Sequence, residues 1–353
     1  MSVHPPALGA RNVPSSNIRV GLLAYGAIGH EHNLAVQATD GLVLSAVCDT
    51  NPERIASALE LAPEAAAFED AGVMLDSGTI DLVVVSTPPD SHYSWAKAAL
   101  QRGIHVILEK PMALTAEQCD ELMSLAESRG LLLVVYQNRR YDRDFVTLAA
   151  LISSGAIGEV FQYDSFVGGH SKPCTYWHSD AAVSGGAIFD WGSHFLDQVL
   201  AVMPGEVAHV SGVNHKRQWT HVTNADHAQV TITFTDGTQA TFVNSDLAAA
   251  RKPKFYVLGT TGAIVGDWDP QAEPAVADLP AILTLHRPDG TRQRMPLDDV
   301  PAHAFHASVV EFLANGVPMA VSASQSRDVV ALMQAAEASA LENGLPVVPH
   351  LLR

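Results

Sequence analysis

A lysine between a glutamate and a proline, at the end of an apolar run, is the first feature of this sequence that suggests chemistry. Residues 103–108 read GIHVIL, which predicts a buried strand, and Glu109, Lys110 and Pro111 follow it directly. Charged side chains are rarely buried without a partner or a function. Pro111 restricts the backbone that aims them. Because doubly wound sheets bind ligands beyond the carboxyl ends of their strands, we predict a ligand site here. A surface ion pair at a strand end is less favoured, since such pairs contribute little.

A second group of polar residues lies in residues 184–197, which read SGGAIFDWGSHFLD. Helical spacing places two sets of side chains on opposite faces: Asp190, His194 and Asp197 on one, and Ile188, Trp191, Phe195 and Val199 on the other. A carboxylate one turn from an imidazole fixes its tautomer and raises its basicity, which suits a proton acceptor in hydride transfer. The alternative is a solvated helix face, because 16 histidines make coincidental pairs common.

The third candidate is a glycine-containing loop, residues 24–29, reading AYGAIG between a predicted strand and a predicted helix. A G-x-G-x-x-G loop in this context brings backbone N–H groups to a pyrophosphate, but its first glycine is Ala24 here. Asp49 ends the next strand, where an acidic side chain would bind the adenosine ribose and favour NAD over NADP. An ordinary turn and a helix-capping role for Asp49 are the alternatives, and Arg54 could instead bind a phosphate.

Two further segments carry candidate binding residues. Ser86, Thr87, Pro88 and Pro89 end another strand and would lie at the same edge of the sheet, with His92 either beside them or on a helix surface. Residues 168–178, GGHSKPCTYWH, supply hydrogen-bond donors and aromatic rings. From this segment the predicted substrate residues are Lys172, Tyr176 and Trp177, although aromatic residues near turns often only pack. Arg139 and Arg140 are interpreted as structural, pairing with Asp142 or Asp144.

The elements that position these residues follow two patterns. From residue 17 to 140, continuous apolar runs alternate with helical segments, one capped by Asn51, one opened by Thr115 and closed by Gly130. This pattern predicts an α/β Rossmann domain with a doubly wound parallel sheet. Residues 1–16 are predicted to be a flexible leader.

Residues 141–353 show strands of period two instead. Alternation over residues 228–242 is interrupted by the turn at Asp236 and Gly237, and a second hairpin is expected at residues 288–290. We predict an α+β C-terminal domain with a largely antiparallel open sheet, one face covered by helices near residues 187–203, 305–314 and 324–343.

Composition excludes several classes of function. The 353 residues suffice for two domains, and 47% hydrophobic residues indicate a folded protein. The net charge of −17 disfavours nucleic acid and anionic membranes as partners. The cysteines, at positions 48, 119 and 174, match neither a disulfide framework nor a metal site. With no secretory signal and no apolar run long enough to span a bilayer, we expect a cytoplasmic protein.

Taken in order, these motifs resemble the Gfo/Idh/MocA family of nicotinamide-dependent sugar and polyol oxidoreductases. The resemblance extends over nearly the whole chain from Asn17. It depends mainly on the intact Glu109-Lys110-Pro111 stretch and on the segment from Gly185 to His194. Residues 136–140 and 252–262 are also similar to family members, including those that act on inositols. The departure is Ala24 in place of a glycine.

The resemblance implies roles for individual residues. Lys110 would hydrogen-bond the reacting oxygen, Asp190 would orient the substrate, and His194 would accept the hydroxyl proton. Glu109 and Pro111 would hold Lys110. The implied cofactor positions are Ala24, Tyr25, Gly26, Ala27, Ile28, Gly29, Asp49, Thr50, Arg54, Thr87, Pro88, Pro89, His92, Glu109, Lys110 and Asn138. The implied substrate positions are Lys110, Tyr141, Lys172, Tyr176, Trp177, Asp190 and His194.

The predicted function is reversible hydride transfer between nicotinamide and a hydroxyl carbon of a cyclic polyol or sugar. NAD is the preferred cofactor, NADP is possible, and no metal is expected. Two alternatives stay open: glycoside cleavage or another lyase-type reaction with internally recycled NAD, and a sugar sensor without turnover. The resemblance also implies a homodimer or homotetramer formed through the C-terminal sheet.

Overall fold

The computed structural model describes residues 17–272 and 279–352 and divides them into two compact units. Residues 1–16, predicted as a leader, lie outside the described residues. The first unit contains the described residues up to Ala113, together with Glu117–Tyr136 and Pro301–Ala323. The second contains Leu114–Ala116, Gln137–Val300 and the residues from Ser324 onward. The sequence had placed residues 301–323 in the second domain, whereas here they join the first unit.

The first unit is built on a parallel sheet with the strand order β3-β2-β1-β4-β5-β6. Its strands are β1 (Ile18–Leu23), β2 (Leu42–Cys48), β3 (Ala66–Phe68), β4 (Leu82–Val85), β5 (His105–Leu108) and β6 (Leu133–Val135). Every pairing is parallel, which confirms the doubly wound architecture. The order reverses between β1 and β4, and such a switch point is where folds of this type bind ligands.

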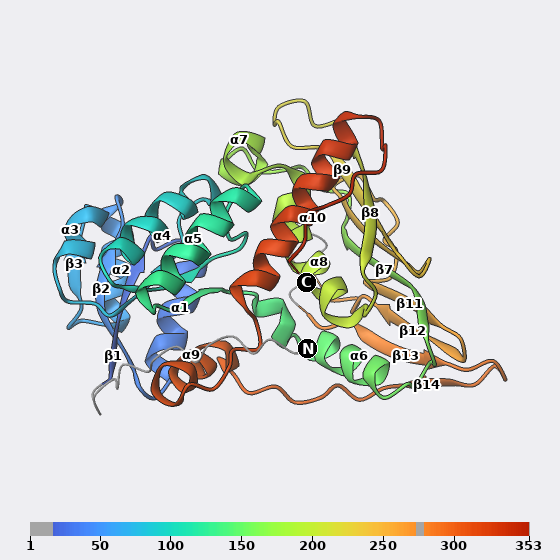
Figure 1. Ribbon diagram of the computed structural model, residues 1–353, viewed down its shortest axis with the longest axis horizontal. Helices are drawn as coiled ribbons and strands as arrows, with labels where there is room; N and C mark the ends of the chain where they lie inside the picture. The colour runs from blue at the N-terminus through green and yellow to red at the C-terminus, as the bar shows by residue number, and fades with distance from the viewer. Residues whose placement is uncertain (1–16, 273–278, 353) are drawn as a thin grey trace. The chain divides into compact units, whose positions relative to one another are not determined.

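Helices connect these strands at the predicted places. They are α1 (Ala27–Ala38), α2 (Pro52–Leu61), α3 (Ala71–Asp76), α4 (His92–Gln101) and α5 (Ala116–Arg129), with the 3₁₀ turn η1 (Pro89–Ser91). Asn51 caps α2 by accepting a hydrogen bond from the Glu53 N–H at 2.9 Å. Gly130 follows α5 with a φ of 63°, as a helix-ending glycine should. Helices α4 and α5 lie side by side (Figure 1), joined by the ion pair of Lys97 with Glu121.

Helix α9 (Ala304–Asn315) corrects one prediction, because it does not cover the antiparallel sheet but belongs to the first unit. Its residues Phe305 and His306 are buried, and their rings pack against Tyr136, which follows β6, with centroids 4.8 and 5.4 Å away. The apolar pattern of α9 was recognised correctly, but such a pattern does not specify which sheet a helix will cover.

The second unit is built on a mostly antiparallel sheet with the order β14-β13-β12-β11-β7-β10-β9-β8. Its strands are β7 (Val160–Gly168), β8 (Val207–His215), β9 (His227–Phe234), β10 (Gln239–Ser245), β11 (Phe255–Gly259), β12 (Gly262–Asp267), β13 (Ile282–His286) and β14 (Arg292–Arg294). Only β7 and β10 pair in parallel among these strands. Both predicted hairpins form, with Gly237 and Gly290 at φ of 85° and 87°.

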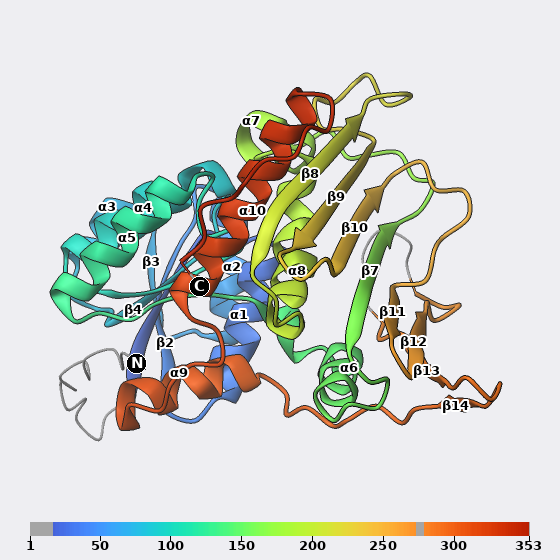
Figure 2. The ribbon, with the colours of Figure 1, turned by 45° about the vertical axis from the view of Figure 1, so that its right-hand side comes forward.

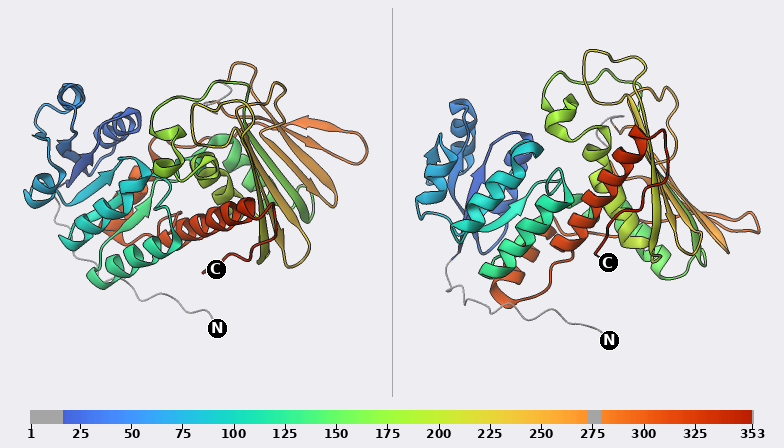
Figure 3. Two further views of the ribbon diagram at one scale, coloured as in Figure 1. Left: turned by 90° about the horizontal axis from the view of Figure 1, so that it is seen from above. Right: turned by 45° about the horizontal axis from the view of Figure 1, so that its top comes forward.

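The helices of the second unit are α6 (Arg143–Ser153), α7 (Ala181–Ser184), α8 (Ala187–Val202) and α10 (Ala323–Leu341), with 3₁₀ turns η2 (Asn138–Tyr141) and η3 (Trp177–Ser179). Helices α8 and α10 lie on one face of the sheet (Figure 2). Gly212 of β8 lets α10 approach closely, since a Cβ there would lie 2.0 Å from the Ala336 carbonyl oxygen. Within the described chain, no helix covers the opposite face (Figure 3). None of the described helices is both long and apolar enough to cross a membrane.

Candidate active site

The loop after β1 adopts the tight turn expected of a pyrophosphate-binding loop, with alanine at its first position. Ala24 has a φ of 72°, a left-handed conformation that normally favours glycine. Gly29, in the first turn of α1, is needed because a Cβ there would lie 2.6 Å from the Ala24 carbonyl oxygen. Ser86, just beyond β4, donates its hydroxyl to the same oxygen at 2.9 Å. The substitution at Ala24 therefore leaves the loop closed, at a cost in backbone strain.

Asp49 holds this loop from the end of β2. Its Oδ2 accepts the Tyr25 N–H at 2.7 Å and its Oδ1 accepts the Asn51 N–H at 2.8 Å. Its side chain is 3% exposed, and Arg54 lies 3.6 Å away across a longer ion pair. Thr50, beside it, is exposed. Asp49 thus has one lone pair on each oxygen left for a ribose hydroxyl.

A pocket of about 390 Å³ adjoins the loop. Its lining residues are Tyr25, Gly26, His30, Asn51, Glu53, Arg54 and Ser57. Since Glu53 and Arg54 both line the pocket, its charge is mixed, and its position beside the loop fits the adenosine end of a dinucleotide.

His92 holds the ends of β4 and β5 together. Its ring is 1% exposed, with Nδ1 2.7 Å from the Pro111 carbonyl oxygen and Nε2 2.8 Å from that of Thr87. Burial lowers the pKa of His92. His92 was predicted as a cofactor contact, but both ring nitrogens face backbone oxygens. His92 would therefore affect a cofactor only through the conformation of Thr87 and Pro88. Thr87 and Pro88 are partly exposed, whereas Pro89 is buried.

Glu109 and Lys110 occupy the end of β5, and Lys110 precedes a cis peptide bond to Pro111. The Glu109 carboxylate is buried, receiving the Lys110 N–H on Oε2 at 3.2 Å and facing Nε2 of His32 at 2.9 Å on Oε1. Lys110 itself is partly exposed. Because β1, β4 and β5 are neighbours in the sheet, their ends place the loop, Thr87 and Lys110 along one edge.

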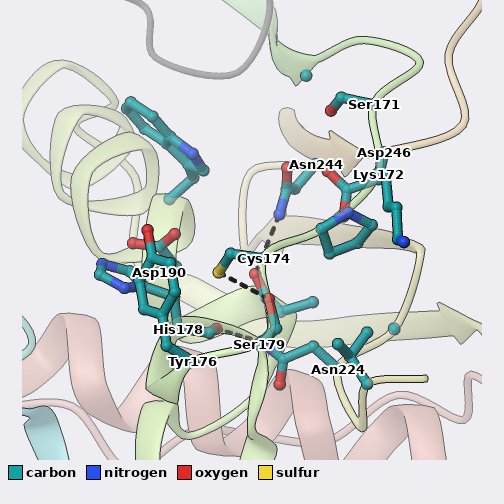
Figure 4. A pocket seen from close by; sticks show the side chains of 16 residues that line it. Ser171, Lys172, Cys174, Tyr176, His178, Ser179, Asp190, Asn224, Asn244 and Asp246 are labelled. Carbon is teal, nitrogen blue, oxygen red and sulfur yellow. Dashed lines mark hydrogen bonds between the residues drawn. The ribbon is translucent and has the colours of Figure 1, made fainter. Parts of the chain in front are cut away.

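The second unit contains a pocket of about 270 Å³ at the start of α8. Three predicted residues line it, namely Lys172, Tyr176 and Asp190. The other lining residues are Gly168, Ser171, Pro173, Cys174, His178, Ser179, Ala187, Trp191, Val222, Asn224, Ala225, Asn244 and Asp246. Figure 4 shows these side chains gathered from α8, the segment after β7 and the end of β10. Hydroxyl, amide, carboxylate, amine and aromatic groups in one pocket suit a ligand with many hydroxyls.

Trp177, His194 and Tyr141, the other predicted substrate residues of the second unit, do not line this pocket. Trp177 stacks on His178, with ring centroids 3.5 Å apart, so its ring packs against a pocket residue. His194 lies one turn after Asp190 on α8 and is 6% exposed. Tyr141 and Asn138 belong to η2 and are partly exposed.

Asn244 and Asp246, at the end of β10, are pocket residues that the sequence analysis missed. Asn244 donates its amide to the carbonyl oxygen of Ala187, the first residue of α8, at 3.3 Å. The pKa of Asp246 is raised to about 6, mainly by burial and also by the nearby carboxylates of Asp226 and Asp190. The available signal was the position of both residues at a strand end, the same signal that identified Lys110.

The expected faces of α8 need two corrections. Asp197, predicted on the polar face, is buried and receives both Nε and Nη2 of Arg140, at 2.6 and 2.7 Å. Trp191, predicted to pack, lines the pocket, with the Arg139 guanidinium 5.4 Å from its ring.

The expected arginine pairs are found in part. Arg139 pairs with Asp142 at 3.3 Å, as expected, but Arg140 pairs with Asp197. Asp144 instead binds Lys254, at 2.7 Å. In the described ranges no group of three His, Cys, Asp or Glu side chains is arranged to hold a metal ion.

Comparisons with known proteins agree with this arrangement. A family model described as "Oxidoreductase family, NAD-binding Rossmann fold" matches residues 18–137, and one described as "GFO/IDH/MocA C-terminal domain" matches residues 145–265. Scyllo-inositol 2-dehydrogenase (NADP(+)) IolW of Bacillus subtilis is 26% identical over 94% of this chain and 96% of its own. The uncharacterized oxidoreductase YdgJ of Escherichia coli is 31% identical over 73% of this chain and 74% of its own.

Solved structures show the same fold. An NAD-binding protein from Listeria innocua superposes with a TM-score of 0.83 at 27% identity, covering 95% of this chain and 97% of that one. Levoglucosan dehydrogenase in complex with NADH gives a TM-score of 0.80 at 21% identity, covering 96% and 100%. The chain belongs to the Gfo/Idh/MocA family of oxidoreductases, with an NAD-binding Rossmann domain and the C-terminal domain typical of that family.

Proposed function

We propose that this oxidoreductase transfers a hydride between nicotinamide and a hydroxyl carbon of a neutral cyclic polyol or sugar. The observation that carries the proposal is the pocket at the start of α8, where the carboxylates of Asp190 and Asp246 outnumber the one ammonium group, of Lys172, and amides, hydroxyls and aromatic rings also line the space. Two carboxylates disfavour an anionic substrate and accept hydrogen bonds from vicinal hydroxyls. Inositol dehydrogenases among the relatives support the same substrate class.

Three residues would carry the chemistry. Lys110 would donate a hydrogen bond to the reacting oxygen, and Asp190 would accept one from a substrate hydroxyl. His194 would take the hydroxyl proton as the carbon is oxidised. When bound, the nicotinamide cofactor supplies the hydride acceptor. The loop from Ala24 to Gly29 and the partly satisfied Asp49 carboxylate fit such a cofactor.

For the cofactor we propose a preference for NAD. The Asp49 carboxylate lies beside the expected ribose position, where it would repel a 2′-phosphate. Arg54 and His30 line the same pocket and are the residues that would admit NADP. The name of the relative IolW specifies NADP(+), so similarity to relatives does not indicate which cofactor this chain prefers. Affinities measured for both cofactors test the preference.

We also propose that the enzyme is a cytoplasmic homodimer or homotetramer that pairs through the open face of its eight-stranded sheet. Tyr256 of β11 is 40% exposed, whereas its neighbour Phe255 is buried under the helices of the other face. Light scattering of the purified protein tests the assembly, and a monomer at micromolar concentration would contradict it.

The deciding experiment follows reduced-nicotinamide absorbance with purified protein, NAD or NADP, and a panel of inositols, aldoses and anhydrosugars. A stoichiometric rise with one substrate supports the proposal and identifies the substrate. Substrate consumption without net reduced nicotinamide would favour a lyase with recycled cofactor. Cofactor binding by calorimetry without consumption of any substrate would favour a sensor.

A further inference from the structure

Three buried side chains of the first unit form a hydrogen-bonded chain that ends at Glu109. His306 of α9 places Nε2 3.0 Å from Nδ1 of His32 in α1, and Nε2 of His32 lies 2.9 Å from Oε1 of Glu109. Both histidines are 0% exposed and Glu109 is 7% exposed. The proposed chemistry assigns no role to either histidine.

The contacts determine where the protons lie. A carboxylate only accepts hydrogen bonds, so Nε2 of His32 carries the proton facing Glu109. If His32 is neutral, its Nδ1 accepts the proton of His306 Nε2. Nδ1 of His306 then holds only a lone pair, and it has no hydrogen-bond partner among the described residues.

The alternative is a protonated His32, which would donate to His306 and leave an N–H at Nδ1 of His306 with no partner. Buried N–H groups without partners are rarer than buried acceptors without them. Burial, together with His32 and His303 nearby, lowers the pKa of His306 well below its usual value, so this ring is neutral. The geometry therefore favours a chain in which the Nε2 N–H of His306 points to His32 and the Nε2 N–H of His32 points to Glu109.

The far end of the chain is the backbone of Lys110, whose N–H donates to Oε2 of Glu109 at 3.2 Å. One carboxylate oxygen of Glu109 is thus held by His32, and the other is held by the backbone N–H of Lys110. The remaining groups around it are His92 from α4 and the Tyr136 ring, which lies 4.4 Å from the ring of His32. A fixed carboxylate fixes the peptide unit from which the Lys110 side chain extends.

We propose that His32 and His306 are positioning residues that hold the Glu109 carboxylate in one rotamer, so that Glu109 holds Lys110 in its working conformation. The inference rests on the catalytic role proposed for Lys110. The proposal gives a function to helix α9, which belongs to the first unit although its residues come late in the sequence.

The first test compares two substitutions of His32 in the full-length enzyme. His32→Gln keeps an N–H donor near the Nε2 position, whereas His32→Phe keeps the ring and removes the donor. We expect kcat to fall about a hundredfold in His32→Phe, as for a misplaced catalytic group, and only a few-fold in His32→Gln. Without its donor the ionised carboxylate is disfavoured, so the acid limb of the kcat profile should move to higher pH in His32→Phe only.

Val36→Ala is the matched control, since it removes buried volume from the same helix and Val36 makes none of the hydrogen bonds of this chain. It should lower the melting temperature and leave the pH profile unchanged. A purely structural role would overturn the proposal. In that case His32→Phe, like Val36→Ala, would lose stability but keep the wild-type pH profile and kcat.

The second test does not depend on turnover or on the folding of His32→Phe. Histidine ring ¹⁵N spectra of the wild-type protein, assigned with His32→Gln and His306→Gln, should show both residues as neutral rings protonated at Nε2. A charged His32, or either ring protonated at Nδ1, would overturn the chain as described. If the wild type turns over no substrate, the proposed function is wrong. The spectra would still test the hydrogen-bonded chain independently of that result.

Discussion

The Asp246 carboxylate should make the affinity for a polyol depend on pH. Its pKa is raised to about 6 by burial and then by Asp226 and Asp190, against a smaller opposing effect of Lys216. Each pH unit changes the ionised-to-neutral ratio tenfold, so Asp246 is about nine-tenths ionised at pH 7 and about one-tenth at pH 5. It lines the pocket, and none of the described side chains donates a hydrogen bond to its carboxylate. We therefore expect a hydroxyl group of the substrate to donate a hydrogen bond to the Asp246 carboxylate.

The size of the effect follows from the hydrogen bond that is lost. A hydrogen bond to a charged group contributes about 1 kcal/mol more than one between neutral groups. Complete protonation of Asp246 would weaken the affinity about fivefold, so the KM for the polyol should rise about three- to fourfold between pH 7 and pH 5. The group is ionised above its pKa, so affinity is highest above pH 6 and is lost as the pH falls.

Initial rates across this pH range, with wild type and Asp246→Asn, measure the effect. Asparagine keeps the shape but does not titrate, so the variant should show a KM near the wild-type value at pH 5 and little change up to pH 7. Any pH dependence of kcat that both proteins share serves as an internal reference. The reasoning is refuted if Asp246→Asn shows the same rise in KM on acidification as the wild type.

Three other substitutions test separate parts of the site. Lys110→Ala should lower kcat/KM by several orders of magnitude with NAD affinity retained by calorimetry, and near-normal rates would exclude the role proposed for the lysine. Asp49→Ala should weaken NAD far more than NADP, whereas equal losses would mean that the carboxylate serves only to hold Tyr25 and Asn51. Ala24→Gly should relieve the left-handed strain, stabilising the fold by about 1 kcal/mol and raising the melting temperature by about 1–2 °C. An unchanged or lower melting temperature would show that the turn is not strained.

The parts of the fold that depend on local chemistry could be predicted from the sequence. Asn51 caps a helix, Gly130 ends one and Gly237 turns a hairpin because each effect involves only a few neighbouring residues. The assignment of α9 failed for the opposite reason, since an amphipathic pattern shows that a face is buried and not what buries it. Only the packing of Phe305 on Tyr136 reveals the partner.

The residues of the candidate site likewise include some that local sequence could predict and some that depend on contacts between distant segments. Lys110 and Asp190 were predicted because each stands in a short motif with a recognisable spacing. Asp246 was missed because its place in the pocket depends on the parallel pairing of β10 with β7, two strands that hairpin patterns do not connect. His32 was missed because its partners are 77 and 274 residues away along the chain.

Helix α1 links the cofactor loop to the proposed catalytic lysine. The loop after β1 runs directly into α1, and Gly29 in its first turn packs against the Ala24 carbonyl oxygen. One turn later the same helix presents His32 to Glu109. A shift of the first turn when a pyrophosphate binds would therefore be transmitted through His32 to the carboxylate that holds Lys110. This link accounts for the buried glutamate at the end of β5, because a buried carboxylate needs hydrogen-bond donors and α1 supplies one of them.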